Sequence, residues 1–244
     1  MKEKLIHFIE RLSIRVLFAL VTFIIALYLF VLLTDEVIID KDHRFDEGVF
    51  HFLADDLTPG LIRVMRFFTF FGKPEFLIPA YIITIFYFVL RKKKQYAIEV
   101  AIMGGSSTLL LFGLKALFRR NRPKLPVLKE LSGFSFPSGH ALLMFVFCSV
   151  LIYLAWNSHL KPIWKWSLAT FLLLFSLVVG ISRIVLRVHY ATDVIAGFCL
   201  GYAWVIFGLW VQRRHMHKKA RLMQALVDEN DSNGKSLARN TEPI

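Results

Sequence analysis

Apolar runs separated by short polar or charged segments extend through most of this chain. A membrane-spanning helix needs about 20 consecutive, mostly apolar residues. Six runs reach or approach that length, and we predict spanning helices at residues 14–34, 75–91, 96–117, 138–157, 164–186 and 192–212. The second run contains Pro79, which a membrane helix tolerates where neighbouring helices satisfy the freed carbonyl group. The pattern predicts an all-α integral membrane protein with six transmembrane helices in residues 14–212.

The segments before and after these runs differ in character. Residues 1–13 place apolar side chains at helical spacing among three cations, which predicts an amphipathic helix on the membrane surface. No small-residue cleavage site follows the first run, so no cleavable signal peptide is predicted. Residues 213–244 begin with clustered Lys and Arg and then become polar, which predicts the basic cytoplasmic end of a helix followed by a disordered tail.

The long connection between the first two runs, residues 34–72, also shows helical spacing. Phe45, Val49 and Phe52 recur at such intervals, and residues 61–71 are almost wholly apolar. Two interfacial helices in an external loop are therefore predicted. Their role stays open between part of an entrance for lipid and a surface hairpin that only packs.

The charges between the runs predict the orientation. Residues 91–94 and 213–221 are basic, whereas residues 35–47 are acidic. The positive-inside rule then places both termini in the cytoplasm. The protein is expected in the inner, or cytoplasmic, membrane. The loop 118–137 contradicts the rule, since it is basic yet would lie outside. A function in binding an anion would explain its position.

Composition agrees with a membrane protein and narrows the possible partners. Of 244 residues, 56% are hydrophobic, against about 45–50% in soluble domains, and the length suggests one domain. The net charge of +12 would suit nucleic acid, anionic lipid or an anionic substrate. Nucleic acid is excluded because the cations cluster at the ends of apolar runs instead of forming a separate module. Cys148 and Cys199 lie inside apolar runs, so no disulfide framework, metal site or cofactor is predicted.

Three polar clusters border the later apolar runs. They are Lys115-x6-Arg122-Pro123, Pro137-Ser138-Gly139-His140 and Ser182-Arg183-x5-His189-x3-Asp193. Each combines cations, small-residue backbone or imidazole in a way that suits a phosphate group. Hydrolysis of a phosphate ester without a metal needs a nucleophile, a proton for the leaving oxygen, and cations for the remaining oxygens. The three clusters together supply these parts.

The third cluster supplies a candidate nucleophile. His189 and Asp193 are four residues apart at the start of the last run and share one face of a helix. A carboxylate there would accept the Nδ1 proton and leave the Nε2 lone pair of His189 free to attack phosphorus. The alternative is an ordinary histidine beside a capping carboxylate.

The second cluster supplies a candidate acid. Pro137 allows a sharp entry to the fourth run, and Ser138 and Gly139 would present backbone N–H groups at a helix N-terminus, where anions bind. His140 follows and could protonate a leaving alkoxide. The alternative is a serine N-cap followed by an interfacial histidine.

Lys115, Arg122 and Arg183 form the candidate cation set, because arginine binds phosphate in a bidentate way and lysine acts as a point charge. For Lys115 the alternative is a side chain that extends to the membrane surface from the end of the third run. For Arg122 the alternative is a solvated loop charge. Four further cations lie near the clusters, namely Arg119, Arg120, Lys124 and Arg187. They would attract anionic head groups or form a second phosphate subsite, but for each one a solvated charge at the rim is the favoured interpretation.

In this order, the clusters resemble the three-part signature of the type 2 phosphatidic acid phosphatase family, which also includes vanadium haloperoxidases and bacterial class A acid phosphatases. All eleven specified residues are present. The resemblance covers residues 72–212 and implies a site at the outer ends of helices three to six. It implies that His189 becomes a phosphohistidine with Asp193 behind it, and that His140 is the acid. It also implies phosphate binding by Lys115, Arg122, Ser138, Gly139 and Arg183.

The sequence therefore predicts an integral membrane lipid phosphate phosphatase that needs no metal. The resemblance suggests phosphatidylglycerol phosphate, phosphatidic acid, a polyprenyl pyrophosphate or the phosphates of lipid A as substrates, and generic apolar walls do not choose among them. A lipid phosphotransferase would use the same site. A non-catalytic anion or lipid transporter is disfavoured because the clusters gather at one face instead of mid-membrane. Gly197-x3-Gly201 is either a dimer face or, preferably, a site of close packing within the bundle, so a monomer or weak dimer is expected.

Overall fold

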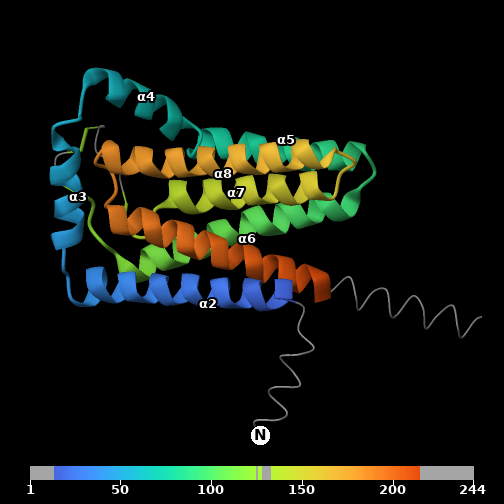
Figure 1. Cartoon of the computed structure of the whole chain (residues 1–244), viewed down its shortest axis with the longest axis horizontal. Helices are drawn as coiled ribbons and strands as arrows, with labels where there is room; N and C mark the ends of the chain where they lie inside the picture. Colours follow the sequence, from blue (N-terminus) through green and yellow to red (C-terminus); the bar gives the residue numbers. More distant parts are fainter. Residues whose placement is uncertain (1–13, 125, 128–132, 215–244) are drawn as a thin grey trace, which may run out of the picture. The chain divides into compact units, whose positions relative to one another are not determined.

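The computed structural model describes residues 14–124, 126–127 and 133–214 of the chain. Residues up to Ile206 form one compact unit, which contains every contact discussed below, and the residues from Phe207 form a second. All regular elements in the described part are helices (Figure 1). They are α2 (Ile14–Thr34), the short π-helix η1 (Asp35–Ile39), α3 (Arg44–Ala54), α4 (Pro59–Phe70), α5 (Pro74–Leu90), α6 (Lys94–Phe118), α7 (Gly139–Trp156), α8 (Pro162–Val185) and a final helix, Ala191–Arg214.

Six helical stretches in the described part are long and apolar enough to cross a membrane. They are Val16–Ile39, Pro59–Leu90, Lys94–Phe118, Gly139–Trp156, Pro162–Val185 and Ala191–Arg214. The second of them joins α4 to α5, and the predicted second span coincides with α5. The all-α fold and the six predicted spans are confirmed, so this is a multi-pass membrane protein. The amphipathic helix predicted at 1–13 and the tail predicted after residue 214 lie outside the described residues.

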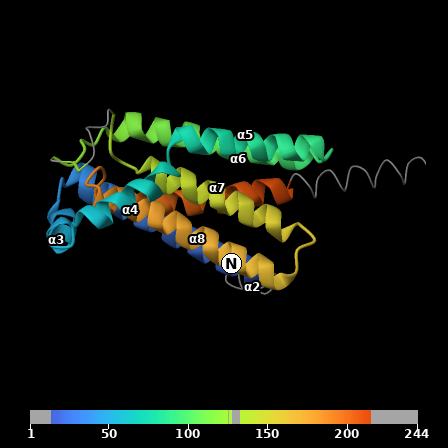
Figure 2. The same ribbon diagram turned by 90° about the horizontal axis from the view of Figure 1, so that it is seen from above.

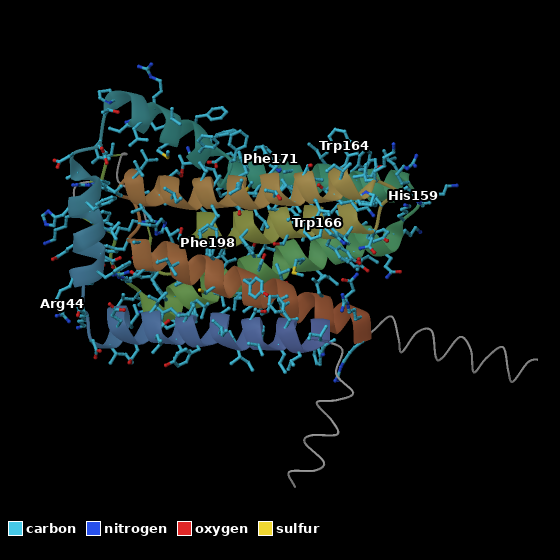
Figure 3. All side chains as sticks on the ribbon, in the orientation of Figure 1. Arg44, His159, Trp164, Trp166, Phe171 and Phe198 are labelled. Carbon is cyan, nitrogen blue, oxygen red and sulfur yellow. The ribbon has the colours of Figure 1, made fainter. Side chains whose placement is uncertain are left out.

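The bundle is arranged around α7. This helix packs against α5, α6 and α8, while α4 packs along α8. Two views at right angles show α3 lying across one end of the bundle (Figures 1 and 2). Arg44 on α3 marks this end, and His159, in the turn between α7 and α8, marks the opposite end (Figure 3).

The bundle is apolar both in its core and on much of its outer surface, and the second feature differs from a protein folded in water. Leu142 and Val146 of α7 are fully buried and form a core with Ala196 of the final helix. Large apolar side chains such as Phe18 on α2 and Phe112 on α6 are exposed instead. Such outward-facing apolar surface suits contact with lipid tails, because a hydrocarbon solvent imposes no cost on it.

Two short helices, α3 and α4, lie in the segment 34–72, where the sequence predicts two helices. α4 begins after Thr58, whose Oγ1 accepts a hydrogen bond from the backbone N–H of Leu61 at 3.2 Å, and has Pro59 in its first turn. Directly after α4, Phe71 packs edge-on against Phe175 of α8, with ring centroids 5.1 Å apart. α4 is therefore held against the bundle.

The small residues of the final helix allow it to approach α7 closely. A Cβ atom on Gly197 would lie 2.8 Å from the carbonyl oxygen of Ser138 and 3.0 Å from Cβ of Ala141. One on Gly201 would lie 3.3 Å from the carbonyl oxygen of Leu142. The interpretation of Gly197 and Gly201 as a site of close packing within the bundle is therefore confirmed. It also fixes the start of α7 against the start of the final helix.

Candidate active site

The three polar clusters meet at the end of the bundle where α3 lies. Lys115 is in the last turn of α6, Ser138 is the N-cap of α7, and Arg183 is in the last turn of α8. His189 lies just before the final helix, and Asp193 lies in its first turn. α6 and α8 run toward this end, and α7 and the final helix start from it (Figure 1). The alternation of helix direction therefore brings distant segments together.

His189 and Asp193 form a buried pair. Nδ1 of His189 lies 3.2 Å from Oδ2 of Asp193, and His189 is only 2% exposed. The same Oδ2 accepts a hydrogen bond from the backbone N–H of Tyr190 at 3.0 Å, as an acidic residue in the first helical turn often does. An ionised carboxylate can only accept, so the pairing places the imidazole hydrogen on Nδ1. Nε2 is then the nitrogen with the lone pair.

Nε2 of His189 faces cationic surroundings. The nearest charged group is Arg122, whose Nη1 lies 3.3 Å away. Burial lowers the pKa of His189 well below its ordinary value, and the positive charges of Arg183, Lys115 and Arg122 lower it further. A backbone contact with Ser135 acts in the opposite direction but is the smallest of these effects. The imidazole is therefore neutral at physiological pH, as a nucleophile must be.

Lys115 and Arg122 hold the loop that follows α6. Nζ of Lys115 donates to the carbonyl oxygens of Phe134 and Ser135 at 2.6 and 3.2 Å. Nη1 of Arg122 donates to the carbonyl of Val188 at 2.9 Å, and its Nε donates to the loop at Gly133. Burial lowers the pKa of the Arg122 guanidinium, although the carboxylate of Asp193 opposes this effect. The alternative of a fully solvated Arg122 is therefore wrong.

Arg183 is the most enclosed of the three candidate cations. It is 1% exposed, and its Nη1 donates to Oγ1 of Thr69 on α4 at 2.6 Å. Its Nε is buried and finds no hydrogen-bond partner among the described residues. A charged donor without a protein partner inside a folded structure points to a ligand that would complete it.

The second cluster supplies two more incomplete groups. Ser138 makes no capping bond with its side chain, and its buried Oγ has no partner within the described part of the chain. The same holds for Nε2 of His140, which lies close enough to Arg183 and His189 to interact with their charges. The alternative of a serine N-cap is right about the position, since Ser138 is the N-cap of α7, but its side chain does not cap the helix. The backbone N–H of Ser138 donates to the carbonyl oxygen of Asp193 at 2.9 Å and ties this cluster to the third. The prediction that this N–H is free for an anion is therefore wrong.

Close packing at glycine positions shapes the surroundings of His140. A Cβ on Gly72, between α4 and α5, would lie 2.5 Å from Cδ2 of His140 and 2.9 Å from Cγ1 of Val179. One on Gly139 would lie 3.0 Å from a methyl group of Leu111. At position 72, only glycine leaves room for the His140 ring in its present position.

The interpretation of Arg120 as a solvated rim charge is wrong. Arg120 is 6% exposed, and its Nη1 donates to Oδ1 of Asp193 at 2.6 Å. Its Nη2 donates to Oδ2 of Asp46 on α3 at 2.8 Å. Asp46 belongs to the acidic segment 35–47 but shares a helical face with Phe50 and Leu53. An acidic residue on an otherwise apolar helix face is a signal that Asp46 is buried, although it does not name Arg120 as the partner.

The other cations outside the signature differ from Arg120. Arg119 and Lys124 are exposed, as a rim position predicts. Arg187 is partly buried, with its guanidinium carbon 5.6 Å from the ring centre of Phe50. Within the described residues, no group of three or more His, Cys, Asp and Glu side chains is placed to hold a metal ion.

Comparison with known proteins identifies the family. The PAP2 superfamily matches residues 95–217, which include all three clusters. The chain belongs to the PAP2 superfamily. Phosphatidylglycerophosphatase B of Bacillus subtilis (strain 168) is 33% identical over 145 residues, which are 59% of this chain and 71% of that one.

Two solved structures resemble the fold. The crystal structure of a transmembrane PAP2-type phosphatidylglycerolphosphate phosphatase from Bacillus subtilis superposes with a TM-score of 0.67 at 27% identity, covering 79% of this chain and 96% of that chain. Aquifex aeolicus LpxE superposes with a TM-score of 0.50 at 27% identity, covering 62% of this chain and 87% of that chain. The resemblance drawn from the sequence is confirmed, and the protein belongs among the membrane PAP2 lipid phosphatases.

Proposed function

We propose that this protein removes the terminal phosphate from a membrane lipid phosphate or pyrophosphate through a covalent phosphohistidine at His189. One observation carries the proposal. The neutral imidazole of His189 is oriented by Asp193 through Nδ1, and its Nε2 faces Arg122. Buried polar atoms of Ser138, His140 and Arg183 that find no partner among the described residues belong to the same end of the bundle. A phosphoryl group has several acceptor oxygens and would complete them.

In the first step Nε2 of His189 attacks phosphorus, and the bond from phosphorus to the lipid oxygen breaks. Lys115, Arg122 and Arg183 stabilise the negative charge on the three other oxygens, together with the N–H group of Gly139 and the hydroxyl of Ser138. His140 donates a proton to the departing oxygen. Asp193 stabilises the positive charge that the phosphorylated imidazole acquires.

In the second step water attacks the phosphorus, and the bond from phosphorus to Nε2 breaks. His140, which gave up its proton in the first step, removes one from the water. Inorganic phosphate leaves, and the original state of both histidines is restored. The same residue acts as acid and then as base, as the reversal of one proton transfer requires.

The charge that a divalent metal would bring to such a reaction is here assigned to side chains. Lys115, Arg122 and Arg183 all contribute to the electrostatic environment of His189. Guanidinium groups bind phosphate oxygens in a bidentate geometry, and an ammonium group adds a point charge. We expect the reaction to proceed without a divalent ion.

The site is proposed to face outward, toward the periplasm where the cell has one. The opposite end of the bundle carries residues 91–94, which are all Lys or Arg, whereas the segment 35–47 near α3 is acidic. The basic loop after α6 remains the exception to this argument, although Arg120 within it lies buried between Asp46 and Asp193.

Accessible cysteines test the orientation. In a variant with Cys148 and Cys199 replaced by serine, Lys124→Cys should react with an impermeant thiol reagent on intact cells. Lys93→Cys should react only after the cells are opened. The reverse pattern would place the site on the cytoplasmic side.

Phosphate release from a panel of lipids tests the function. The purified protein in detergent, with excess chelator, should release phosphate from one or more of four substrates: phosphatidylglycerol phosphate, phosphatidic acid, a polyprenyl pyrophosphate and lipid A. The first is the leading candidate, because it is the substrate named for two of the relatives. His189→Ala should abolish the release. A folded wild type that releases none, with or without added magnesium, would refute the proposed function, and a strict need for magnesium would refute its metal-free form.

A further inference from the structure

A chain of buried ionic contacts links α3 to the nucleophile. Arg120 lies between two carboxylates and donates to Asp46 from Nη2 and to Asp193 from Nη1. Nη1 also donates to Oγ1 of Thr192 at 2.8 Å, and Nη2 lies 3.2 Å from Nδ1 of His43. Both terminal nitrogens of the guanidinium are therefore engaged.

Asp46 is held as firmly as Arg120. Its Oδ1 accepts from the backbone N–H of Thr192 at 2.9 Å, and its Oδ2 accepts from the Thr192 hydroxyl at 2.7 Å. The carboxylate thus caps the first turn of the final helix from outside that helix. The ring of Tyr190 closes the cluster, with its centre 4.1 Å from the guanidinium carbon of Arg120.

We propose that Arg120 and Asp46 are positioning residues for the reaction and set the charge and direction of the Asp193 carboxylate that orients His189. This inference rests on the proposed function. Neither is a specified residue of the three clusters, although Arg120 lies between Lys115 and Arg122 of the first. Arg120 takes one oxygen of Asp193, which leaves the other for Nδ1 of His189. Asp46 in turn holds Arg120 and shares its positive charge.

Because Asp46 and Asp193 share Arg120, the effective charge of the Asp193 carboxylate depends on Asp46. One guanidinium between two carboxylates leaves the trio with a net negative charge, in a region where charges are poorly screened. If Arg120 served Asp193 alone, it would cancel most of that carboxylate's charge and weaken its attraction for the imidazole proton. Because Asp46 draws on the same cation, Asp193 keeps enough charge to hold Nδ1–H and to stabilise the phosphorylated ring.

Other charges around His189 must be held constant in any test. The titratable and charged groups that surround it come from all the neighbouring elements: His43 and Asp46 at α3, Lys115 on α6, Arg120 and Arg122 after it, His140 on α7, Arg183 on α8, and Tyr190 and Asp193 beside it. Replacing Arg120 or Asp46 changes none of the others in identity.

The proposal predicts opposite shifts in the pH dependence of kcat/KM. Arg120→Gln removes positive charge beside Asp193, so the His189–Asp193 pair binds a proton more tightly. The acid limb of the kcat/KM profile is the pH range in which activity is lost as pH falls. In the Arg120→Gln variant this limb should move up by about one pH unit. Asp46→Asn leaves the whole charge of Arg120 to Asp193, so the acid limb should move down. The double variant should lie between the two, since its net charge equals that of the wild type.

A conservative variant separates charge from geometry. Arg120→Lys keeps the positive charge but cannot bond Asp46 and Asp193 at once with a planar fork. It should keep the acid limb near the wild-type position and lower kcat by about tenfold, within the range seen when an outer partner of a functional histidine is lost. Asp46→Glu should also leave the acid limb of kcat/KM near its wild-type pH.

The same helix offers a matched control. Asp42 and Arg44 form an ion pair of 2.6 Å at the start of α3, but Arg44 is 91% exposed. Asp42→Asn and Arg44→Gln make the same chemical changes within a few residues of Asp46. Neither should move the acid limb. A shift in these variants would mean that general surface charge, not the buried trio, sets the limb.

The assay is the release of phosphate from phosphatidic acid by the full chain in detergent, with each variant checked for folding by size-exclusion profile and thermal unfolding. A purely structural role would lower the folded fraction without moving the limb of the remaining activity. Shifts of Arg120→Gln and Asp46→Asn in the same direction, or no shift in either, would overturn the proposal. If Arg120→Gln does not fold, the proposal is tested by Asp46→Asn, which should move the acid limb down, and by Arg120→Lys, which should leave it unchanged.

A readout without turnover keeps this inference separate from the proposed function. The His189 imidazole can be titrated by nitrogen NMR in histidine-labelled protein, with His189→Gln used to assign its signals. The same opposite shifts are expected in its apparent pKa. If the wild type hydrolyses no lipid phosphate, the proposed function fails, while the titration still confirms or refutes the coupling from Asp46 to His189.

Discussion

Arg183 on α8 donates a hydrogen bond to Thr69 on α4, with 2.6 Å between Nη1 and Oγ1 and both side chains buried. The two residues are 114 positions apart in the chain. Nε of Arg183 has no partner in the described part of the chain. Thr69 therefore fixes one side of the guanidinium, and another side is left for the phosphate oxygen that we propose it binds.

Thr69→Val should weaken substrate binding. The change keeps the shape of the side chain but removes the acceptor of a buried charged donor, a loss of about 1–3 kcal/mol. We expect kcat/KM to fall about tenfold, which corresponds to ~1.4 kcal/mol, mainly through a higher KM. Thr69→Ser should retain most activity. Thr84→Val on α5 is the matched control, since the Thr84 hydroxyl donates to the carbonyl of Ala80 in its own helix.

Gly72→Ala should displace His140. The new methyl group would lie 2.5 Å from the His140 ring and 2.9 Å from Val179, so one of them has to move. Hydrolysis of a lipid monophosphate should fall by about 10²–10⁴-fold if the ring loses its place as general acid. Gly48→Ala in α3 meets no atom within 4 Å and should leave activity intact. Equal activity of the two variants would show that the position of His140 is not critical.

Rapid quenching should trap phosphate on His189. The adduct should be labile in acid and stable in base, as expected for a phosphorus–nitrogen bond, and His189→Ala should remove both the label and turnover. His159→Ala provides the control, because His159 is exposed at the opposite end of the bundle (Figure 3). Label that survives in His189→Ala would assign the nucleophile to another residue.

The leaving group should reveal the role of His140. The alkoxide released from a monoester is strongly basic and needs a proton, whereas the phosphate released from a pyrophosphate is a much weaker base. His140→Ala should therefore impair hydrolysis of a lipid monophosphate by about 10²–10⁴-fold and that of a polyprenyl pyrophosphate much less. His189→Ala should abolish both. Equal losses for His140→Ala on the two substrates would mean that this residue binds phosphate instead of donating a proton.

The wild type should stay active below the ordinary pKa of histidine. Burial and nearby cations lower the pKa of His189, and only the neutral form can attack. As pH falls, activity is lost when this group becomes protonated, so the acid limb of kcat/KM should lie below about 6.5. The measurement is kcat/KM from pH 4.5 to 8 after correction for ionisation of the substrate. An acid limb above that value would contradict the lowered pKa.

The sequence was sufficient for the membrane fold and for the residues of the three clusters. A spanning helix has to satisfy its backbone internally and present apolar side chains over about 20 residues, so α6, α7 and α8 are visible as continuous runs. The clusters could be read because each is local: His189 and Asp193 share one turn, and Ser138 and His140 share one helix start. Such features depend on spacing along the chain and need no knowledge of its neighbours.

Tertiary structure alone decided which charges are paired. Arg120 lies in a basic loop and reads as solvated, yet it is buried because α3 brings Asp46 from 74 residues away to meet it. Thr69 is likewise one hydroxyl in an apolar segment until α4 packs along α8 and places it on Arg183. The reason is physical. A buried charge is stable only when a partner reaches it, and the partner's position is set by how helices pack, which no pattern within either segment records.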